Sequence, residues 1–299
     1  MMNKKIVLAG GTGFVGKYFA EQFKKVGYDV IIISRQPNHV QWGDSTAILK
    51  AIENSEMVIN LAGKSVDCRY NEKNKAEISR SRIETTKALG EAILQCKNPP
   101  PLWINSSSGT LYRHAEDHGM TEDRGEVGTG FSVGIVKRWE EIFFSFHLPK
   151  TRQVALRMTI VLGKDGGAIK PLANLVRFGL GGQQGNGNQM FSWVHIEDLY
   201  QMVLFIQQHT ELEGPFNCAS PNAINNRTLM KTFRNILKVK IGLPSPKWLL
   251  EIGAVIIKTQ TELILKSRWV LPEKLMKSGF TFKYPTIELA LKDILTHDL

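Results

Sequence analysis

Lys5-Ile-Val-Leu-Ala-Gly10-Gly-Thr-Gly13-Phe-Val-Gly16 joins an apolar, β-branched run to three glycines spaced three residues apart. The residues that follow have helical composition, so the segment predicts a strand, a glycine turn and a helix. Gly10 permits the tight turn, Gly13 lets backbone amides approach a pyrophosphate at the helix N-terminus, and Gly16 allows close packing of helix on sheet. A structural turn with chance glycines is the alternative, but this context favours a dinucleotide-binding turn.

The same alternation of short apolar runs and helical patterns continues over the first 160 residues. We expect strands near 4–9, 29–33, 57–61, 102–106 and 153–158 and helices at 14–26, 73–96 and 131–148. Strands that alternate with helices are typical of βαβ units. The sequence therefore predicts an α/β fold with a doubly wound parallel sheet of the Rossmann type.

The later part of the chain has a different pattern. Gly179–Asn188 is rich in glycine and amides and predicts a lid loop over about 179–192, followed by a helix at 197–209. From Pro244 onward, helical segments are broken by prolines, so we expect a first domain over 1–240 and a smaller, mostly helical one over 241–299. Charges interrupt Trp248–Leu265, which favours an amphipathic helix over a membrane span.

Composition narrows the class of protein. The formal charge is +10 with 38 Lys and Arg residues, but the basic residues are scattered and form no nucleic-acid arm. The three cysteines, Cys68, Cys96 and Cys218, are far apart and indicate neither a disulfide framework nor a metal site. The N-terminal apolar run is too short for a secretory signal. We expect a soluble, cytoplasmic protein that binds neither nucleic acid nor membrane.

The residues after the second strand indicate which dinucleotide is bound. An acidic residue there would bond the ribose 2′-hydroxyl of NAD, but the chain has Ser34 and Arg35. The arginine offers a planar fork for a 2′-phosphate, although a solvated surface arginine is the alternative. Small residues in Asn60-Leu-Ala-Gly63 would let a cofactor lie across the sheet. The sequence favours NADP(H).

With these motifs, the chain resembles the extended or atypical short-chain dehydrogenases/reductases, the group that contains nucleotide-sugar epimerases and dehydratases. Ile78-Ser-Arg-Ser-Arg82-Ile-Glu-Thr-Thr86, Leu162-Gly-Lys-Asp-Gly-Gly167, GLGGQQGNGNQMFSWVHIEDL and a closing segment from Leu271 to Pro285 are similar to one subgroup, the uncharacterised "epimerase family protein" set. The closing segment resembles that subgroup's small C-terminal domain. The resemblance implies NADP binding and no settled substrate.

The resemblance also implies site residues. The expected cofactor contacts are Gly10, Thr12, Gly13, Phe14, Val15, Gly16, Ser34, Arg35, Leu61, Ala62, Gly63, Glu77, Arg82 and Ser106. Among the catalytic residues of the extended enzymes, Ser108 matches the serine and Lys137 the lysine, but Val133 stands at the tyrosine position. Valine has no proton to give, so the ordinary acid–base mechanism cannot operate unchanged.

Three alternatives follow from the missing tyrosine. Tyr112, His114, Tyr70 or Ser108 itself could take over proton transfer, the proton could come from solvent or substrate, or the chain could bind NADP(H) without turnover and act as a redox sensor. For an enzyme, we expect a small-molecule substrate in a pocket formed by the lid, Asp67–Tyr70 and the C-terminal segment. A homodimer is compatible with the sequence.

Four further residues favour structural roles. His195 is expected at a strand-to-helix join, and Asn217 resembles an asparagine that closes the core of the extended enzymes. Trp193, Phe191 and the segment containing Trp248 could form an apolar wall for a substrate, but aromatic residues at such spacing usually belong to the core.

Overall fold

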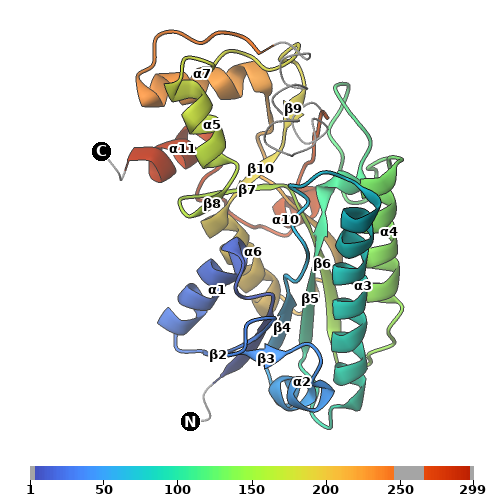
Figure 1. Cartoon of the computed structure of the whole chain (residues 1–299). Coiled ribbons are helices and arrows are strands. Elements are labelled where there is room, and N and C mark those ends of the chain that lie inside the picture. Colours follow the sequence, from blue (N-terminus) through green and yellow to red (C-terminus); the bar gives the residue numbers. More distant parts are fainter. Residues whose placement is uncertain (1–3, 246–265, 297–299) are drawn as a thin grey trace.

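The computed structural model describes residues 4–245 and 266–296 (Figure 1). The predicted amphipathic helix at Trp248–Leu265 lies outside the described residues. Among the helices that the structure describes, none has the length and apolar character needed to cross a bilayer.

A seven-stranded parallel sheet forms the centre of the fold, with strand order β11-β6-β5-β4-β1-β2-β3. Its strands are β1 (Lys5–Ala9), β2 (Asp29–Ser34), β3 (Val40–Gln41), β4 (Met57–Asn60), β5 (Leu102–Ser108), β6 (Arg152–Met158) and β11 (Gly214–Cys218). The five predicted strands and the doubly wound topology are confirmed. From β1 the chain builds outward in both directions, so the crevice at the ends of β1 and β4 is the switch point where such sheets bind ligands.

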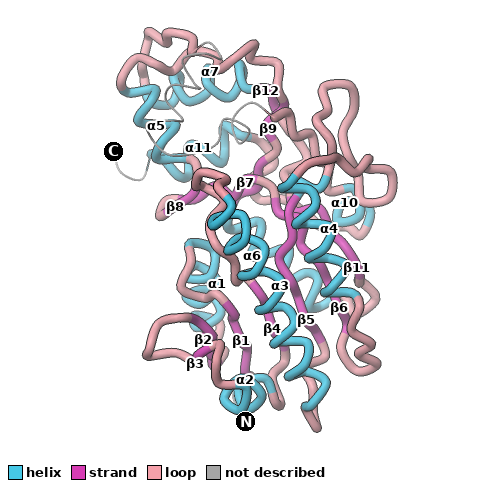
Figure 2. Tube along the Cα trace, turned by 45° about the vertical axis from the view of Figure 1, so that its right-hand side comes forward, coloured by secondary structure: helices cyan, strands magenta, loops and turns pink. Residues whose placement is uncertain are grey.

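Helices cover both faces of this sheet (Figures 1 and 2). Side chains alternate along each strand, so Ile6 and Leu8 face one core and Val7 and Ala9 face the other. The first core is closed by α1 (Phe14–Lys25) and α6 (Ile196–Gln208), and the second by α2 (Ser45–Ile52), α3 (Glu72–Gln95) and α4 (Phe131–Phe144). Of these helices, α1, α3, α4 and α6 match those predicted from the sequence, although α4 ends four residues before the predicted boundary, and α2 was not predicted.

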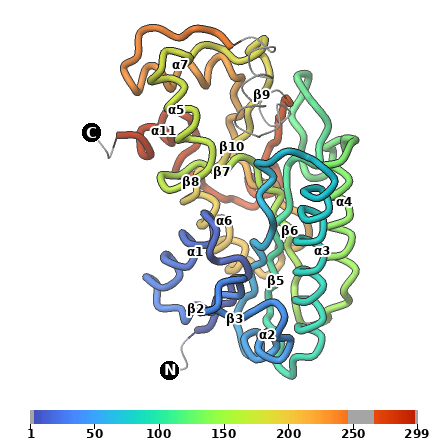
Figure 3. Tube along the Cα trace, viewed as in Figure 1, coloured from blue at the N-terminus to red at the C-terminus, as the bar shows by residue number. Residues whose placement is uncertain are grey.

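A second lobe lies beyond the carboxyl ends of the strands and has its own apolar core (Figure 3). It contains the short strands β7 (Ile160–Gly163), β8 (Gly166–Gly167), β9 (Met190–Phe191), β10 (Trp193–His195) and β12 (Ile224–Asn225), and the helices α5 (Ile169–Arg177), α7 (Asn226–Leu237) and α11 (Ile287–Thr296). Side chains of α5, α7 and α11 pack in one cluster. The C-terminal segment therefore shares a core with residues that precede 240.

The segment predicted as a lid, 179–192, is tied to this lobe. Gly182 N donates to Leu243 O at 3.0 Å, and Gln184 N donates to Asn226 Oδ1 at 2.8 Å. Gln184 and Gln189 are buried. A buried side-chain anchor and backbone pairing of this kind hold a loop in place, so in this structure the segment is part of the second lobe.

Candidate functional site

The glycine turn has the geometry that its sequence predicts. Gly10 has a φ of +78°, and a Cβ there would lie 2.7 Å from Ala62 N, so only glycine fits between β1 and the end of β4. A Cβ on Gly16 would lie 2.6 Å from Gly11 Cα. Gly13 caps α1 without a side-chain hydrogen bond, and the first turn of α1 contains no acidic residue. The amides of Phe14 and Val15 therefore remain available to an anion.

Ser34 is the last residue of β2 and Arg35 follows it. The end of this strand lies beside the glycine turn, since Gly10 N donates to Ile33 O at 2.8 Å. Ser34 is buried, and its Oγ accepts from Gln36 N at 3.0 Å. Arg35 is exposed and makes no hydrogen bond or ion pair within the described parts of the chain. Its guanidinium is thus free to bind a phosphate without first breaking an ion pair.

A cavity of about 350 Å³ opens next to the turn, at the carboxyl ends of the central strands. Its walls include seven of the residues singled out from the sequence, namely Leu61, Ala62, Gly63, Tyr70, Arg82, Ser106 and Ser108. The remaining wall comes mainly from α4 and from Met158–Val161. A concave, largely apolar pocket with a few polar groups at a switch point is typical of a ligand site.

Arg82 supplies a positive charge to this cavity. Its Nη1 donates to Lys64 O at 3.1 Å and to Ile78 O at 3.0 Å, and the guanidinium lies over the Trp139 ring, 5.2 Å from its centroid. Burial lowers the pKa of Arg82 to about 10. No carboxylate among residues 4–245 and 266–296 pairs with it. A buried cation without a counter-ion favours an anionic or electron-rich ligand.

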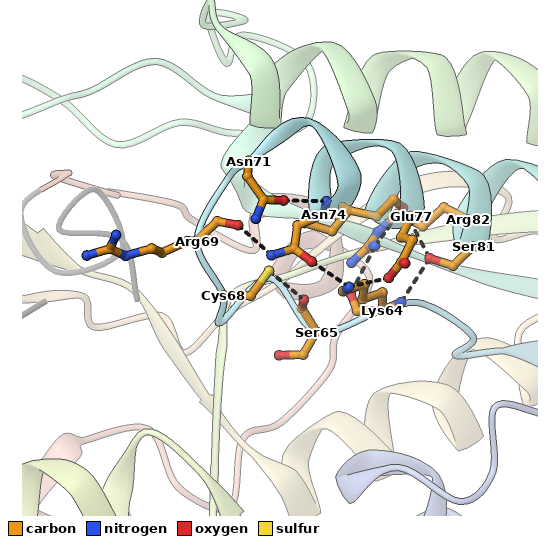
Figure 4. A network of polar contacts seen from close by, with 10 residues as sticks. Lys64, Ser65, Cys68, Arg69, Asn71, Asn74, Glu77, Ser81 and Arg82 are labelled. Carbon is orange, nitrogen blue, oxygen red and sulfur yellow. Dashed lines mark hydrogen bonds and ion pairs between the residues drawn. The ribbon is translucent and has the colours of Figure 1, made fainter. Parts of the chain in front are cut away.

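Glu77 contacts a second cation of the cavity wall (Figure 4). Its carboxylate binds Lys64 Nζ, which also donates to Asn74 Oδ1 at 2.8 Å. The hydrogen bond and charge of Lys64 lower the pKa of Glu77. Lys64 lines the cavity, whereas Glu77 is not one of its wall residues. The structure therefore gives Glu77 a positioning role through Lys64. The sequence led us to expect a direct cofactor contact, but Glu77 does not line the pocket itself.

The pocket face of α4 has neither a tyrosine nor a lysine. Phe131, Ser132, Ile135, Val136 and Trp139 line the cavity, with the spacing of one helix face. A tyrosine and a lysine four residues apart that both faced this cavity would have to be among these residues.

Val133 and Lys137, which the sequence placed at the tyrosine and lysine positions, each follow a residue of the pocket face by one position. Val133 is buried against Leu111, and Lys137 is exposed to solvent. Since one residue turns a helix by about 100°, neither side chain faces the cavity. Lys137 is not a wall residue of this cavity, and its catalytic role stays a prediction. Neither member of the tyrosine–lysine pair is present on the pocket face.

Tyr112 is also separate from the cavity. Its hydroxyl donates to Asn217 Oδ1 at 2.8 Å and accepts from Arg157 Nη1 at 2.9 Å. Burial raises the pKa of Tyr112, which makes it a weaker acid. The side chain is buried and is not part of the cavity wall. The structure thus separates Tyr112 from this cavity, and its role as the catalytic replacement stays a prediction. His114, the other candidate nearby, is exposed and accepts from Ser267 N at 3.1 Å.

The structural assignments of His195 and Asn217 are confirmed. His195 caps α6, with Nδ1 accepting from Glu197 N at 3.2 Å, and its Nε2 lies 3.4 Å from Asp293 Oδ2. Asn217 Nδ2 donates to Leu271 O at 2.9 Å, which ties β11 to the C-terminal segment. Trp193 and Phe191 belong to the core of the second lobe. Trp248 lies outside the described residues.

Comparison with known proteins agrees with this architecture. The model of the NAD dependent epimerase/dehydratase family matches residues 6–219, more than half of the chain. The chain belongs to the NAD dependent epimerase/dehydratase family. A domain of unknown function, DUF1731, matches residues 245–294, as the resemblance of the closing segment implied. This epimerase-family chain therefore also has the C-terminal domain of the predicted subgroup.

Individual relatives extend over nearly the whole chain. The human epimerase family protein SDR39U1 is 28% identical, covering 97% of this chain and 99% of its own length, and the Staphylococcus aureus epimerase family protein SAR0825 is 30% identical, covering 98% and 99%. The crystal structure of human SDR39U1 (isoform 2) with NADPH has a TM-score of 0.87 at 29% identity, covering 98% of this chain and 99% of that chain.

A more distant solved structure shares the fold over only part of its length. The nucleoside-diphosphate sugar epimerase from Corynebacterium glutamicum has a TM-score of 0.78 at 25% identity, covering 99% of this chain and 59% of its own. The likeness to this epimerase thus includes nearly the whole chain, at a modest sequence identity.

Trp139 is a residue of this epimerase-family pocket that sequence reasoning missed. Its Nε1 donates to Thr86 Oγ1 at 2.9 Å, and Thr86 belongs to a buried amide cluster in which Asn60 Nδ2 donates to Asn105 Oδ1 at 2.7 Å. This cluster fixes the Trp139 ring beneath Arg82. The signal in the sequence is the eight-residue spacing from Phe131, which is informative only once the pocket face of the helix is known.

Proposed function

We propose that this chain binds NADP(H) at the glycine turn. At Gly10 and Gly16, neighbouring backbone lies so close that no side chain would fit. The N-terminus of α1 therefore has backbone and no side chain beside it, as a bound pyrophosphate requires. Ser34 and the unpaired Arg35 suit a 2′-phosphate and provide no carboxylate for the hydroxyl of NAD. The human relative of known structure contains NADPH, which supports the same cofactor here.

We propose further that the protein is an oxidoreductase. The cavity of about 350 Å³ beside the turn supports this proposal, because its wall extends beyond the expected cofactor contacts to the polar residues Ser108, Thr110 and Ser132, where a substrate could bind beside the cofactor. The bound nicotinamide would supply hydride chemistry, and the protein would orient the reactants. Arg82 would stabilise negative charge that develops on the substrate. The hydroxyls of Ser108, Ser132 and Thr110 line the cavity and can donate hydrogen bonds to a substrate oxygen.

Reduction of a small carbonyl compound fits this pocket better than sugar epimerisation. Epimerisation through a ketone requires one group to remove a hydroxyl proton and return it, and the residues of α4 that line the cavity include neither a tyrosine nor a lysine. A reduction needs a single proton, which water can provide. A cytoplasmic location is part of this proposal, and the three free cysteines are consistent with it.

The test is NADPH oxidation with a panel of aldehydes and ketones. We expect turnover with at least one compound, a clear loss in Ser108→Ala and Ser132→Ala, and no change in Lys137→Ala, the exposed control on the same helix. Absence of turnover with every compound, in a protein that binds NADPH, would favour the sensor. Loss of turnover in Lys137→Ala would contradict the pocket face assigned to α4.

A further inference from the structure

The far end of the second lobe carries three exposed apolar side chains. Phe178, which follows α5, is 82% exposed, Ile241 is 68% exposed and Leu243 is 58% exposed. Leu243 N donates to Gly179 O at 2.8 Å, so the loop after α7 lies directly beside the end of α5. Phe178, Ile241 and Leu243 therefore form one group, which we call the apolar tip. Single exposed apolar side chains are ordinary on protein surfaces, but a group of them marks an interaction site.

The segments that build this end of the lobe have a one-sided charge. Residues 166–196 and 214–245 contain no aspartate or glutamate. Their seven cations are Lys170, Arg177, Arg227, Lys231, Arg234, Lys238 and Lys240. These basic residues look scattered along the sequence, but the fold places α5 and α7 side by side (Figures 1 and 2). The result is a positive surface around the apolar tip.

The cations next to the apolar tip are not neutralised by carboxylates. Arg177, Lys238 and Lys240 are exposed and form no ion pair within residues 4–245 and 266–296. Glu288 of α11 is the acidic side chain in the groove beside α7, and Lys292 lines the same groove. The groove therefore adds no net negative charge, and the surface attracts an anionic partner.

The arginines of α7 are bound to uncharged groups. Arg227 Nε donates to Gln183 Oε1 at 2.9 Å, and Arg234 Nη1 donates to Gly181 O. A carbonyl oxygen does not cancel the charge of a guanidinium, so both arginines add to the positive surface. Their bonds also hold the loop that follows Phe178, so the apolar tip is ordered before a partner arrives.

We propose that the apolar tip and the cations around it bind the surface of an anionic lipid bilayer. The aromatic and aliphatic side chains of the tip insert among the acyl chains, and the neighbouring lysines and arginines contact anionic headgroups. A nucleic acid would use the charges but would leave the aliphatic Ile241 and Leu243 in water, and interfaces between protein copies are depleted in lysine. A bilayer uses both features of this surface.

The sequence led us to expect no membrane binding, because the apolar tip and its ring of charge form only in the folded chain. Binding of this kind is peripheral and requires no helix that crosses the bilayer. The surface is built from the second lobe and includes none of the residues proposed to bind NADP(H) or substrate. The inference therefore stands or falls independently of the proposed function.

The test is co-sedimentation of the full chain with lipid vesicles. We expect binding to vesicles of equal parts phosphatidylcholine and phosphatidylserine that weakens with added salt, and binding to phosphatidylcholine alone that is weaker by about 10-fold or more. Phe178→Ser and Ile241→Ser should each weaken binding to the mixed vesicles by about 5-fold or more, because each removes inserted apolar surface. Combining Lys238→Gln with Lys240→Gln should weaken it by about 20-fold, since each lysine near an anionic surface contributes about 5-fold.

Matched controls separate this surface from general effects. Combining Lys50→Gln with Lys87→Gln removes the same net charge from exposed positions on α2 and α3, which cover the sheet away from the second lobe (Figure 1). Leu94→Ser removes an apolar side chain that is 56% exposed on α3. Both controls should bind the mixed vesicles within about 2-fold of the unmodified protein, because charges far from the contact are screened. Thermal melts of Phe178→Ser should match the unmodified protein, since an exposed side chain contributes little to stability.

Several results would overturn the proposal. One is absence of binding to the mixed vesicles, and another is equal weakening in the control variants, which would indicate attraction by net charge alone. A melting temperature that falls in Phe178→Ser would mean that the side chain is covered in solution. Binding of a DNA duplex without binding of vesicles would assign the cations to a nucleic acid. Dimerisation in gel filtration that Phe178→Ser abolishes, without vesicle binding, would assign the apolar tip to a second copy of the chain.

Discussion

Breaking the buried ion pair between Glu140 and Arg157 should strongly destabilise the protein. The Glu140 carboxylate accepts from Arg157 Nε at 2.9 Å, from Arg157 Nη2 at 2.8 Å and from Ser107 Oγ at 2.5 Å. Both charged side chains are only 12% exposed. Burial disfavours the charged form of Arg157, but the bonds and charge of Glu140 outweigh it and raise the pKa of the guanidinium. Because the ordinary pKa of arginine is far above neutral pH, Arg157 stays charged even if its partner is removed.

Glu140→Gln tests this pair. Removing one partner of a buried pair costs about 3–5 kcal/mol, because the other charge is left uncompensated. Glutamine keeps the volume and one acceptor oxygen, so we expect a loss of about 3 kcal/mol in the free energy of unfolding. Urea denaturation measures it, with Glu141→Gln, an exposed neighbour on α4, as the control expected to change stability by less than about 0.5 kcal/mol. A loss below about 1 kcal/mol in Glu140→Gln would refute the reasoning.

Three further predictions concern the turn, the cap of α6 and the cofactor. Gly16→Ala should destabilise the protein by about 1–3 kcal/mol, because the new Cβ would meet backbone atoms. Gly134→Ala has open space around it and should stabilise α4 by about 0.5–1 kcal/mol. Thermal melts in which both variants shift equally would contradict this. Burial lowers the pKa of His195 to about 4, so its neutral form is favoured in the folded state and stability should fall as pH drops from about 6.5 toward 4. His195→Asn keeps a capping oxygen and should reduce this loss of stability in acid, measured by urea titrations at about pH 7 and pH 4.5. An unchanged acid sensitivity would contradict the assignment of the loss to His195. Arg35→Ala should weaken NADPH binding by about 10-fold or more and leave NADH binding unchanged, and unaltered NADPH affinity in calorimetry would remove Arg35 from the site.

The cofactor end of the site could be predicted from the sequence because its signals are local. The strand, the glycines at 10, 13 and 16 and the helix are consecutive in the chain, and Gly10 and Gly16 stand where a Cβ would lie too close to neighbouring backbone. The position of Arg35 follows from the end of one strand. The structure confirms the strand–turn–helix geometry without help from distant residues.

The catalytic end could not be predicted in the same way. The assignments of Val133 and Lys137 depend on the rotation of α4, and an error of one residue turns a side chain by about 100°. That rotation is set by the packing of α4 against Leu111 and the sheet, which involves residues far apart in the chain. The apparent nearness of Tyr112 to Ser108 misleads for a similar reason, because the short 3₁₀ turn at Gly109–Leu111 carries the tyrosine toward Arg157.

Calorimetric titration of the unmodified protein with NADPH and with NADH tests the central claim most directly. The account predicts saturable binding of NADPH at one site per chain and binding of NADH that is weaker by about 10-fold or more, since only NADPH carries the phosphate that Arg35 would bind. Equal affinity for the two cofactors would contradict the assignment of the 2′-phosphate site. Binding of neither cofactor would contradict the proposed function.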